Sequence, residues 1–287
     1  MSIFKGIKFR QIRPRKIALS FSVFILALLI AMVSAVPIIW VIFTALKDRT
    51  KVIKNPLGPP EEWVWRNFTD AWEIGHFGTY FKNSIIVAVP TVLMILSLAM
   101  MAAYAFALMR FRGRNILFVV FLIGMTVPLN VLIVPLFYEL RALGLLNTYW
   151  ALILPQAAKL LPFSILLLYS FLRELPREIL DSALIDGCNH WSLLRHIVLP
   201  LSRPSLLTVL IFTFMWTWNN FILPTVVIQI DKVRTLPVGL NFFQGQYVTD
   251  LPLLMAGATI TFLPVILVYL VFQRHFIKGI TAGALTS

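Results

Sequence analysis

The sequence predicts an all-α membrane protein in which six transmembrane helices form a single domain over residues 1–287. Hydrophobic residues make up 59% of the chain and charged residues 13%, and the mean hydropathy is +0.86. Soluble domains carry about 25% charged residues. Several apolar stretches also exceed the ~18 residues that mark a membrane-spanning helix, and they lack the short alternating segments of a membrane β-barrel.

The first predicted span follows a basic N-terminus, residues 1–16. A signal peptide has a shorter hydrophobic region and a small-residue cleavage site, so we expect this span to be retained. The third span begins at Ile116 and reaches Pro128. The other predicted spans are Ile17–Leu46, Asn83–Leu108, Tyr149–Phe171, Ser205–Ile228 and Leu253–Phe272.

The segments between these spans differ in character. A polar loop rich in proline and tryptophan is expected over Lys47–Phe81, and a second loop over Gln229–Pro252. The tryptophans suit the headgroup level of a bilayer. Val131–Leu145 carries two charged residues and is expected to break at Pro135, so we predict a short surface or re-entrant helix there.

Lysine and arginine are distributed unequally between the two sides that six spans define. The side with both termini and the segment between spans 4 and 5 has 15 Lys and Arg against 4 Asp and Glu. The other side has 9 against 8, and Lys159 lies within span 4. Since cytoplasmic loops carry the excess of basic residues, we expect residues 1–16, 173–204 and 276–287 to be cytoplasmic. This orientation accounts for the net charge of +13, and no nucleic-acid partner is predicted.

No pattern in the sequence indicates catalysis, a metal site or a bound cofactor. There is no Gly-rich phosphate loop and no Ser, His and Asp set, and the four histidines lie in different loops. Cys188 is the single cysteine, which excludes an internal disulfide. A membrane enzyme is therefore the least favoured function. The lack of a strong internal repeat also argues against the interpretation that the chain is a secondary transporter built from inverted repeats.

Two groups of polar residues lie within the predicted spans. Lys159 and Gln156 belong to span 4, and a charge facing lipid at the bilayer centre costs ~2.5–3.5 kcal/mol on insertion scales. Either Lys159 lines a pore, or it snorkels to an interface or pairs with another group. Trp218, Asn219 and Asn220 of span 5 either face a sugar path or form interhelical hydrogen bonds and an aromatic belt.

Residues Pro176–Pro204 form a compact, charged, helix-forming segment between two apolar spans. Pro176 suits a first helical position, and Gly187 suits the position just after a helix end. Asn189 is a good N-cap for a second helix, which Pro200 is expected to stop. Two short helices joined by a tight turn form a rigid knob that can transmit force from a soluble partner. An ordinary interfacial helix pair is the alternative.

This segment resembles the signature of the inner-membrane subunits of ABC importers, which has the form E-A-A-x-x-D-G and ends in I-x-L-P. The chain has D-S-A-L-I-D-G at Asp181–Gly187 and I-V-L-P at Ile197–Pro200. It departs from the signature by Asp for Glu and Ser for Ala at the first two positions, and Cys188 stands where a small residue is usual. The resemblance implies a coupling helix that docks in a cleft of an ATPase subunit. The core of that contact would be formed by Asp181, Ser182, Ala183, Asp186 and Gly187.

Three further stretches, Ala103–Asn115, Trp216–Pro224 and Phe276–Ser287, resemble carbohydrate importer subunits of the maltose type. The resemblance implies a multi-pass permease of the bacterial-type inner membrane, surrounded by lipid, that moves a carbohydrate by alternating access, and the carbohydrate is expected to be an oligosaccharide. It also implies a second permease subunit, two ATPase subunits that hold ATP and magnesium, and an extracytoplasmic solute-binding protein. An ABC importer for another solute, such as an amino acid or polyamine, and a secondary transporter or channel are the alternative functions.

Overall fold

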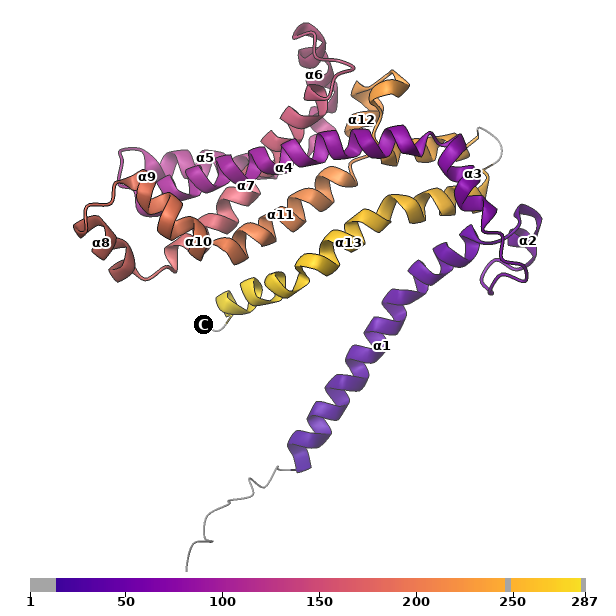
Figure 1. The fold of residues 1–287 in the computed structure, drawn as a ribbon, viewed down its shortest axis with the longest axis horizontal. Helices are drawn as coiled ribbons and strands as arrows, with labels where there is room; N and C mark the ends of the chain where they lie inside the picture. The colour runs from indigo at the N-terminus through magenta and orange to yellow at the C-terminus, as the bar shows by residue number, and fades with distance from the viewer. Residues whose placement is uncertain (1–13, 246–248, 285–287) are drawn as a thin grey trace, which may run out of the picture.

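The computed structural model describes residues 14–245 and 249–284 of the chain (Figure 1). In this part of the chain the fold is helical, and the strand-like pairing is limited to an isolated bridge between Gln244 and Thr249. The helices and helical turns are α1 (Pro14–Ala45), α2 (Arg49–Lys54), α3 (Arg66–Ile74), α4 (Phe77–Leu108), α5 (Arg114–Thr126), α6 (Leu129–Ala142), α7 (Trp150–Arg173), α8 (Arg177–Ile185), α9 (His190–Leu193), η1 (Leu194–Val198), α10 (Leu199–Leu201), α11 (Arg203–Trp218), α12 (Ile222–Val227), η2 (Asp231–Val233), η3 (Leu236–Phe243) and α13 (Leu251–Ala284).

Four of the described helices are long and apolar enough to cross a membrane: Ser22–Ala45 within α1, α4, α7, and Leu251–Gln273 within α13. Two bent pairs pass the same test together, α5 with α6 at 99° and His190–Leu201 with α11 at 76°. The described residues thus hold up to six candidate spans by length and composition. The predicted all-α membrane architecture is confirmed, and the count of six spans stays a prediction.

The long helices form a bundle in which α4 and α7 make the most extensive pair, α11 packs against both, and α13 packs against α11. Figure 1 shows α8, α9 and α10 gathered at one end of this bundle, and α2 and α3 at the other. α1 contacts α13 but diverges from the bundle toward its own N-terminal end. Its most apolar stretch has no buried residue, so this surface requires lipid or another protein around it.

The short helix predicted after the third span is not broken at its proline. Pro135 lies inside α6 without ending it, so the predicted break at Pro135 is wrong. The bend lies at Pro128 instead, between α5 and α6. A proline forces the residue before it out of the helical region, and Val127 is accordingly extended, with φ −84° and ψ 115°.

The fifth predicted span, Ser205–Ile228, is interrupted. α11 ends at Trp218, Asn219 caps it, and α12 starts again at Ile222. Asparagine disfavours helix interiors because its amide competes for backbone hydrogen bonds. Here the Asn220 Oδ1 atom accepts a hydrogen bond from the Leu223 backbone N–H at 3.3 Å. The prediction of one continuous span is therefore wrong at this point.

The predicted polar loop Lys47–Phe81 contains two helices, α2 and α3, and its last residues already belong to α4. Asp48 caps α2 by accepting a hydrogen bond from the Thr50 backbone N–H at 2.9 Å. The side-chain and backbone hydrogen bonds of Thr50 lower the pKa of the Asp48 carboxyl. Asn67 ties α3 to the end of α1 by donating to the carbonyl of Ala45 at 2.8 Å. This end of the molecule is therefore a structured cap on the bundle.

Candidate functional site

The turn between α8 and α9 has the hydrogen bonds of a Schellman motif. The Gly187 N–H donates to the carbonyl of Leu184 at 3.1 Å, and the Cys188 N–H donates to the carbonyl of Ala183 at 3.0 Å. Gly187 has a φ of +91°, in the left-handed region that favours glycine. The prediction that Gly187 stands just after the first helix is confirmed.

Asn189 begins the second helix as predicted, because its side-chain oxygen accepts a hydrogen bond from the Ser192 N–H at 2.8 Å. The helical chain then continues through α9, the π-helical turn η1 and α10 to Leu201. Pro200 lies inside α10, so the expectation that it stops the helix is wrong. In η1 the hydrogen bonds span five residues, and Leu199 donates to the carbonyl of Leu194. This wider turn changes the hydrogen-bond register just before the proline, which lacks an N–H of its own.

The inner face of this helix pair is anchored in the bundle. Leu180 and Ala183 of α8 are each 6% exposed, and they share a buried cluster with Leu172 of α7 and Tyr104 of α4. The Tyr104 hydroxyl also lies 2.9 Å from the Nδ1 atom of His190. The helix pair is thus packed against α4 and α7 through these residues.

The residues of the predicted coupling contact divide between the two faces of α8 and the turn after it. Asp181, Ser182, Asp186 and Gly187 are exposed and lie at one end of the molecule, whereas Ala183 faces the core. A small side chain at Ala183 lets α8 approach the bundle closely. The structure therefore brings four of the five predicted residues to one accessible surface.

Two exposed apolar side chains on this surface were missed by the sequence reasoning. Ile185 is 85% exposed at the end of α8, and Trp191 is 63% exposed on α9. Apolar side chains that project from a charged surface are typical of contact sites with another protein. The signal that could have found Ile185 is helical periodicity, which puts it off the face that Leu180 and Ala183 bury.

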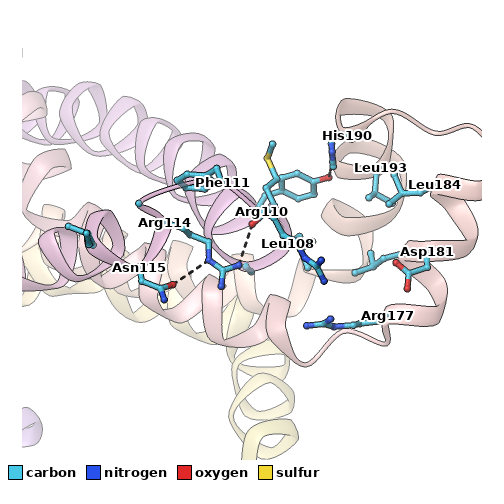
Figure 2. A pocket seen from close by; sticks show the side chains of 16 residues that line it. Leu108, Arg110, Phe111, Arg114, Asn115, Arg177, Asp181, Leu184, His190 and Leu193 are labelled. Atoms are coloured by element: carbon cyan, nitrogen blue, oxygen red, sulfur yellow. Dashed lines mark hydrogen bonds between the residues drawn. The ribbon is translucent and has the colours of Figure 1, made fainter.

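A hollow of about 1020 Å³ separates α8 from the 109–115 loop, a segment made of the connection between α4 and α5 and the first two residues of α5. Figure 2 shows it from close by, with Arg110 and Arg114 on one side and Arg177, Asp181 and His190 on the other. Both polar and apolar side chains line the hollow. Arg114 is held in place by hydrogen bonds to the carbonyl of Met109 at 3.3 Å and to Asn115 Oδ1 at 3.4 Å.

The polar residues of the predicted fifth span lie at the break between α11 and α12. Trp218 is buried, and its indole N–H donates to the carbonyl of Thr261 on α13 at 2.9 Å. Asn219 is exposed, and Asn220 is half-buried and caps α12. The structure thus assigns the Trp218 indole to helix packing and leaves Asn219 as the accessible amide.

Lys159 and Gln156 lie on α7, apart from these residues. The Lys159 Nζ atom donates to the carbonyl of Val127 at 2.6 Å, at the end of α5, where a cation also interacts favourably with the helix dipole. Gln156 is 3% exposed, and its side-chain oxygen has no hydrogen-bond partner among the described residues. Of the alternatives for Lys159, which were a pore-lining role, snorkelling and pairing with another group, the structure favours the pairing.

Comparison with known proteins decides the family. Residues 95–282 match the family described as "Binding-protein-dependent transport system inner membrane component". The chain belongs to this family. The matched region contains α8, α9, the hollow and all the predicted site residues, so the site described above lies within the part of the fold that defines these transport components.

Individual relatives match over nearly the whole chain. It is 36% identical over 260 residues to the diacetylchitobiose uptake system permease NgcG of Streptomyces coelicolor, covering 90% of this chain and 86% of the relative. It is 34% identical over 258 residues to the arabinooligosaccharides transport system permease AraQ of Halalkalibacterium halodurans, covering 88% and 92%. The fold is similar to a crystallised bacterial ABC transporter involved in alginate import, with a TM-score of 0.74 at 20% identity over 96% of this chain and 100% of that one.

Proposed function

We propose that this chain is a permease subunit of an ATP-driven ABC importer for an oligosaccharide, and that α8 and α9 form its coupling element. The observation that carries the proposal is the rigid knob at one end of the bundle. Its inner face is buried with Leu172 and Tyr104, and its outer face presents Ile185 and Trp191 among charged residues. Because the inner face is packed into the bundle and the outer face is partly apolar, the knob can receive force from a soluble partner and pass it to α4 and α7.

The proposed partners follow from the same surfaces. Two ATPase subunits bind and hydrolyse ATP with magnesium, and one of them receives Asp181, Ser182, Asp186 and Gly187 of the knob. A second permease subunit and lipid cover the apolar face of α1 and complete the pore. An extracytoplasmic binding protein delivers the substrate at the α2 and α3 end. The family description, which names a binding-protein-dependent transport system, supports this last assignment.

An oligosaccharide is the proposed cargo because the relatives NgcG and AraQ are named for diacetylchitobiose and arabinooligosaccharide transport. The accessible Asn219 amide at the break between α11 and α12, beside exposed aromatic rings such as Trp216, is consistent with a polyhydroxylated substrate. Importers of amino acids or polyamines are the competing function within the same family.

Orientation is also part of the proposal. The knob, the 109–115 loop and both termini face the cytoplasm, where the ATPase subunits are, because the excess of Lys and Arg lies on that side. The α2 and α3 end then faces outward toward the binding protein.

The coupling assignment is tested with Ile185→Asp and a matched control, Ile53→Asp on α2, since Ile53 is 86% exposed at the opposite end. Neither change touches the core, so both variants accumulate in the membrane. Ile185→Asp is expected to reduce co-purification of the ATPase subunits by about tenfold or more, as loss of an interface hot spot does. ATP-driven uptake falls with it, and Ile53→Asp retains ATPase association. Normal association and uptake by Ile185→Asp would refute the coupling role of the knob.

The cargo is tested on the assembled importer in proteoliposomes with its binding protein. Diacetylchitobiose, arabino-oligosaccharides and alginate oligosaccharides are compared with amino acids and polyamines as stimulants of ATP hydrolysis. Stimulation by at least one of the sugars supports the proposal. Stimulation by an amino acid or polyamine alone assigns the importer to another solute, and uptake that proceeds without ATP assigns it to secondary transport.

A further inference from the structure

The hollow between α8 and the 109–115 loop has a charge pattern that the coupling role does not require. Arg110, Arg114 and Arg177 line it, against the single carboxylate of Asp181. Arg110 and Arg177 come from segments far apart in the chain, and Figure 2 shows both side chains extending into the same space. Neither guanidinium group lies within ion-pair distance of a carboxylate in the described part of the chain, whereas several other basic residues do.

The backbone at the rim adds positive potential to that of the arginines. α5 begins at Arg114 and α8 at Arg177, both beside the hollow, and neither helix has a side-chain cap at its N-terminus. Free N–H groups and the positive end of the helix dipole favour an anion at such positions. Glu178 in the first turn of α8 offsets part of this potential, so the uncapped start of α5 and the three arginines are the main sources of positive charge on this concave surface.

The wall of the hollow also carries apolar side chains. Ile116, which is 73% exposed at the start of α5, and Leu184 of α8 line it together with the arginines. A charged group with an apolar extension matches this combination better than a bare ion does. Basic pockets beside membrane helices bind phospholipid headgroups in this way.

We propose that this hollow is a binding site for a phosphate group, supplied by the headgroup of an anionic phospholipid or by a soluble phosphate compound. Arg110 and Arg177 hold the phosphate from opposite sides of the hollow. Each guanidinium group can pair with phosphate oxygens through two parallel N–H donors. Arg114 contributes charge from the position fixed by its hydrogen bonds to Met109 and Asn115. Asp181 on the rim lowers the net charge of the lining from +3 to +2 and thereby selects against highly charged anions. A bound phosphate ties the 109–115 loop to α8.

The test compares the double variant Arg110→Gln/Arg177→Gln with Arg112→Gln. Arg112 belongs to the same loop but does not line the hollow, so it controls for the general basic charge of this surface. The full-length chain is reconstituted in bilayers of phosphatidylcholine with phosphatidylglycerol, released into detergent and weighed by native mass spectrometry. Wild type and Arg112→Gln are expected to retain phosphatidylglycerol. The double variant retains about 10- to 30-fold less, because two cationic contacts are lost.

A second arm measures the binding of inorganic phosphate to the same proteins in detergent without anionic lipid. Phosphatidylglycerol retention that depends on Arg110 and Arg177 assigns the site to a lipid. Phosphate binding that depends on them, with equal lipid retention by all variants, assigns it to a soluble phosphate. Arg110→Lys/Arg177→Lys keeps the charge and is expected to restore part of the binding. Equal behaviour of the Gln double variant and Arg112→Gln in both arms overturns the proposal, and since neither arm measures transport, the result is independent of the proposed importer function.

Discussion

At the scale of single residues, the turn between α8 and α9 depends on backbone conformation more than on space. A Cβ atom added at Gly187 would meet nothing within 4 Å, so a larger side chain is not excluded by a clash. The φ of +91° is the constraint, and residues other than glycine pay about 1–2 kcal/mol to adopt a left-handed conformation. A substitution at Gly187 therefore loosens the turn, and the direction in which α9 leaves α8 becomes less well defined.

Asn189→Ala removes the side-chain cap of α9. The hydrogen bond from the Ser192 N–H to the Asn189 side chain is lost, at a cost of about 1 kcal/mol of local stability. Hydrogen exchange of the α9 amides is therefore expected to become about fivefold faster, while exchange in α4 and α7 is unchanged. Asn189→Asp keeps an acceptor at the same place and serves as the control. Equal exchange in the Ala and Asp variants would contradict the capping role.

Trp218→Phe tests whether this residue packs or lines a path. Phenylalanine keeps the ring contacts with Phe81 and Phe214 but loses the hydrogen bond to the Thr261 carbonyl. We expect a loss of about 1 kcal/mol of stability, measured as earlier thermal unfolding, with substrate preference unchanged. Trp150→Phe is the matched control, because Trp150 is 51% exposed and has no proposed role in the substrate path. A changed preference with unaltered stability would favour a direct contact with the substrate.

At the scale of helices, two candidate spans are interrupted rather than continuous. α5 and α6 diverge by 99° at Pro128, and α11 is separated from α12 at Asn219 and Asn220. In hydrocarbon every freed backbone group needs a partner, so breaks of this kind persist where side chains or other helices supply one. Lys159 supplies it at the first break and Asn220 at the second.

Lys159→Met removes the donor that holds the end of α5. The Val127 carbonyl then loses its partner, and interhelical hydrogen bonds in membrane proteins contribute about 0.6–1.7 kcal/mol. The variant is expected to unfold at lower temperature, with faster hydrogen exchange around the bend between α5 and α6. Lys232→Met, an exposed lysine outside the long helices, controls for the loss of one positive charge. Unchanged stability of Lys159→Met would contradict the structural pairing and favour the alternative in which Lys159 lines the pore.

The sequence predicted the features that depend on residues close together in the chain, namely apolar helices, a turn and a helix cap. Apolar runs predicted α4, α7 and α13. The conformation at Gly187 follows from its lack of a Cβ atom, and the cap at Asn189 follows from its side-chain oxygen. The bend at Pro128 lies where the predicted third span ends, and Lys159 of another helix stabilises it, whereas the intact helix across Pro135 was not predicted. The exposure of Ile185 and the hollow at Arg110 depend on how segments far apart in sequence pack, and no local pattern encodes that.

At the scale of the whole molecule, the bundle has two ends of different character. One end carries the knob and the basic 109–115 loop, and the other carries α2, α3 and the exposed Trp63 and Trp65 (Figure 1). The α1 helix and much of α5 expose apolar side chains along the sides between these ends. A molecule of this form fits a bilayer with a soluble partner at each end, and the charge distribution determines which end faces inward.

The single cysteine makes that orientation testable on the native chain. Cys188 is partly buried in the turn of the knob, so a membrane-impermeant maleimide is expected to label it in inverted vesicles, to a fraction of the level after denaturation. In intact cells that express the chain alone, Cys188 is expected to be protected, because the proposed orientation places the knob in the cytoplasm. Glu61→Cys combined with Cys188→Ser places the thiol on the exposed loop between α2 and α3, where Glu61 is 66% exposed, and is expected to give the reverse pattern. Labelling of Cys188 in intact cells would show that the knob faces outward, where no cytoplasmic ATPase subunit could reach it.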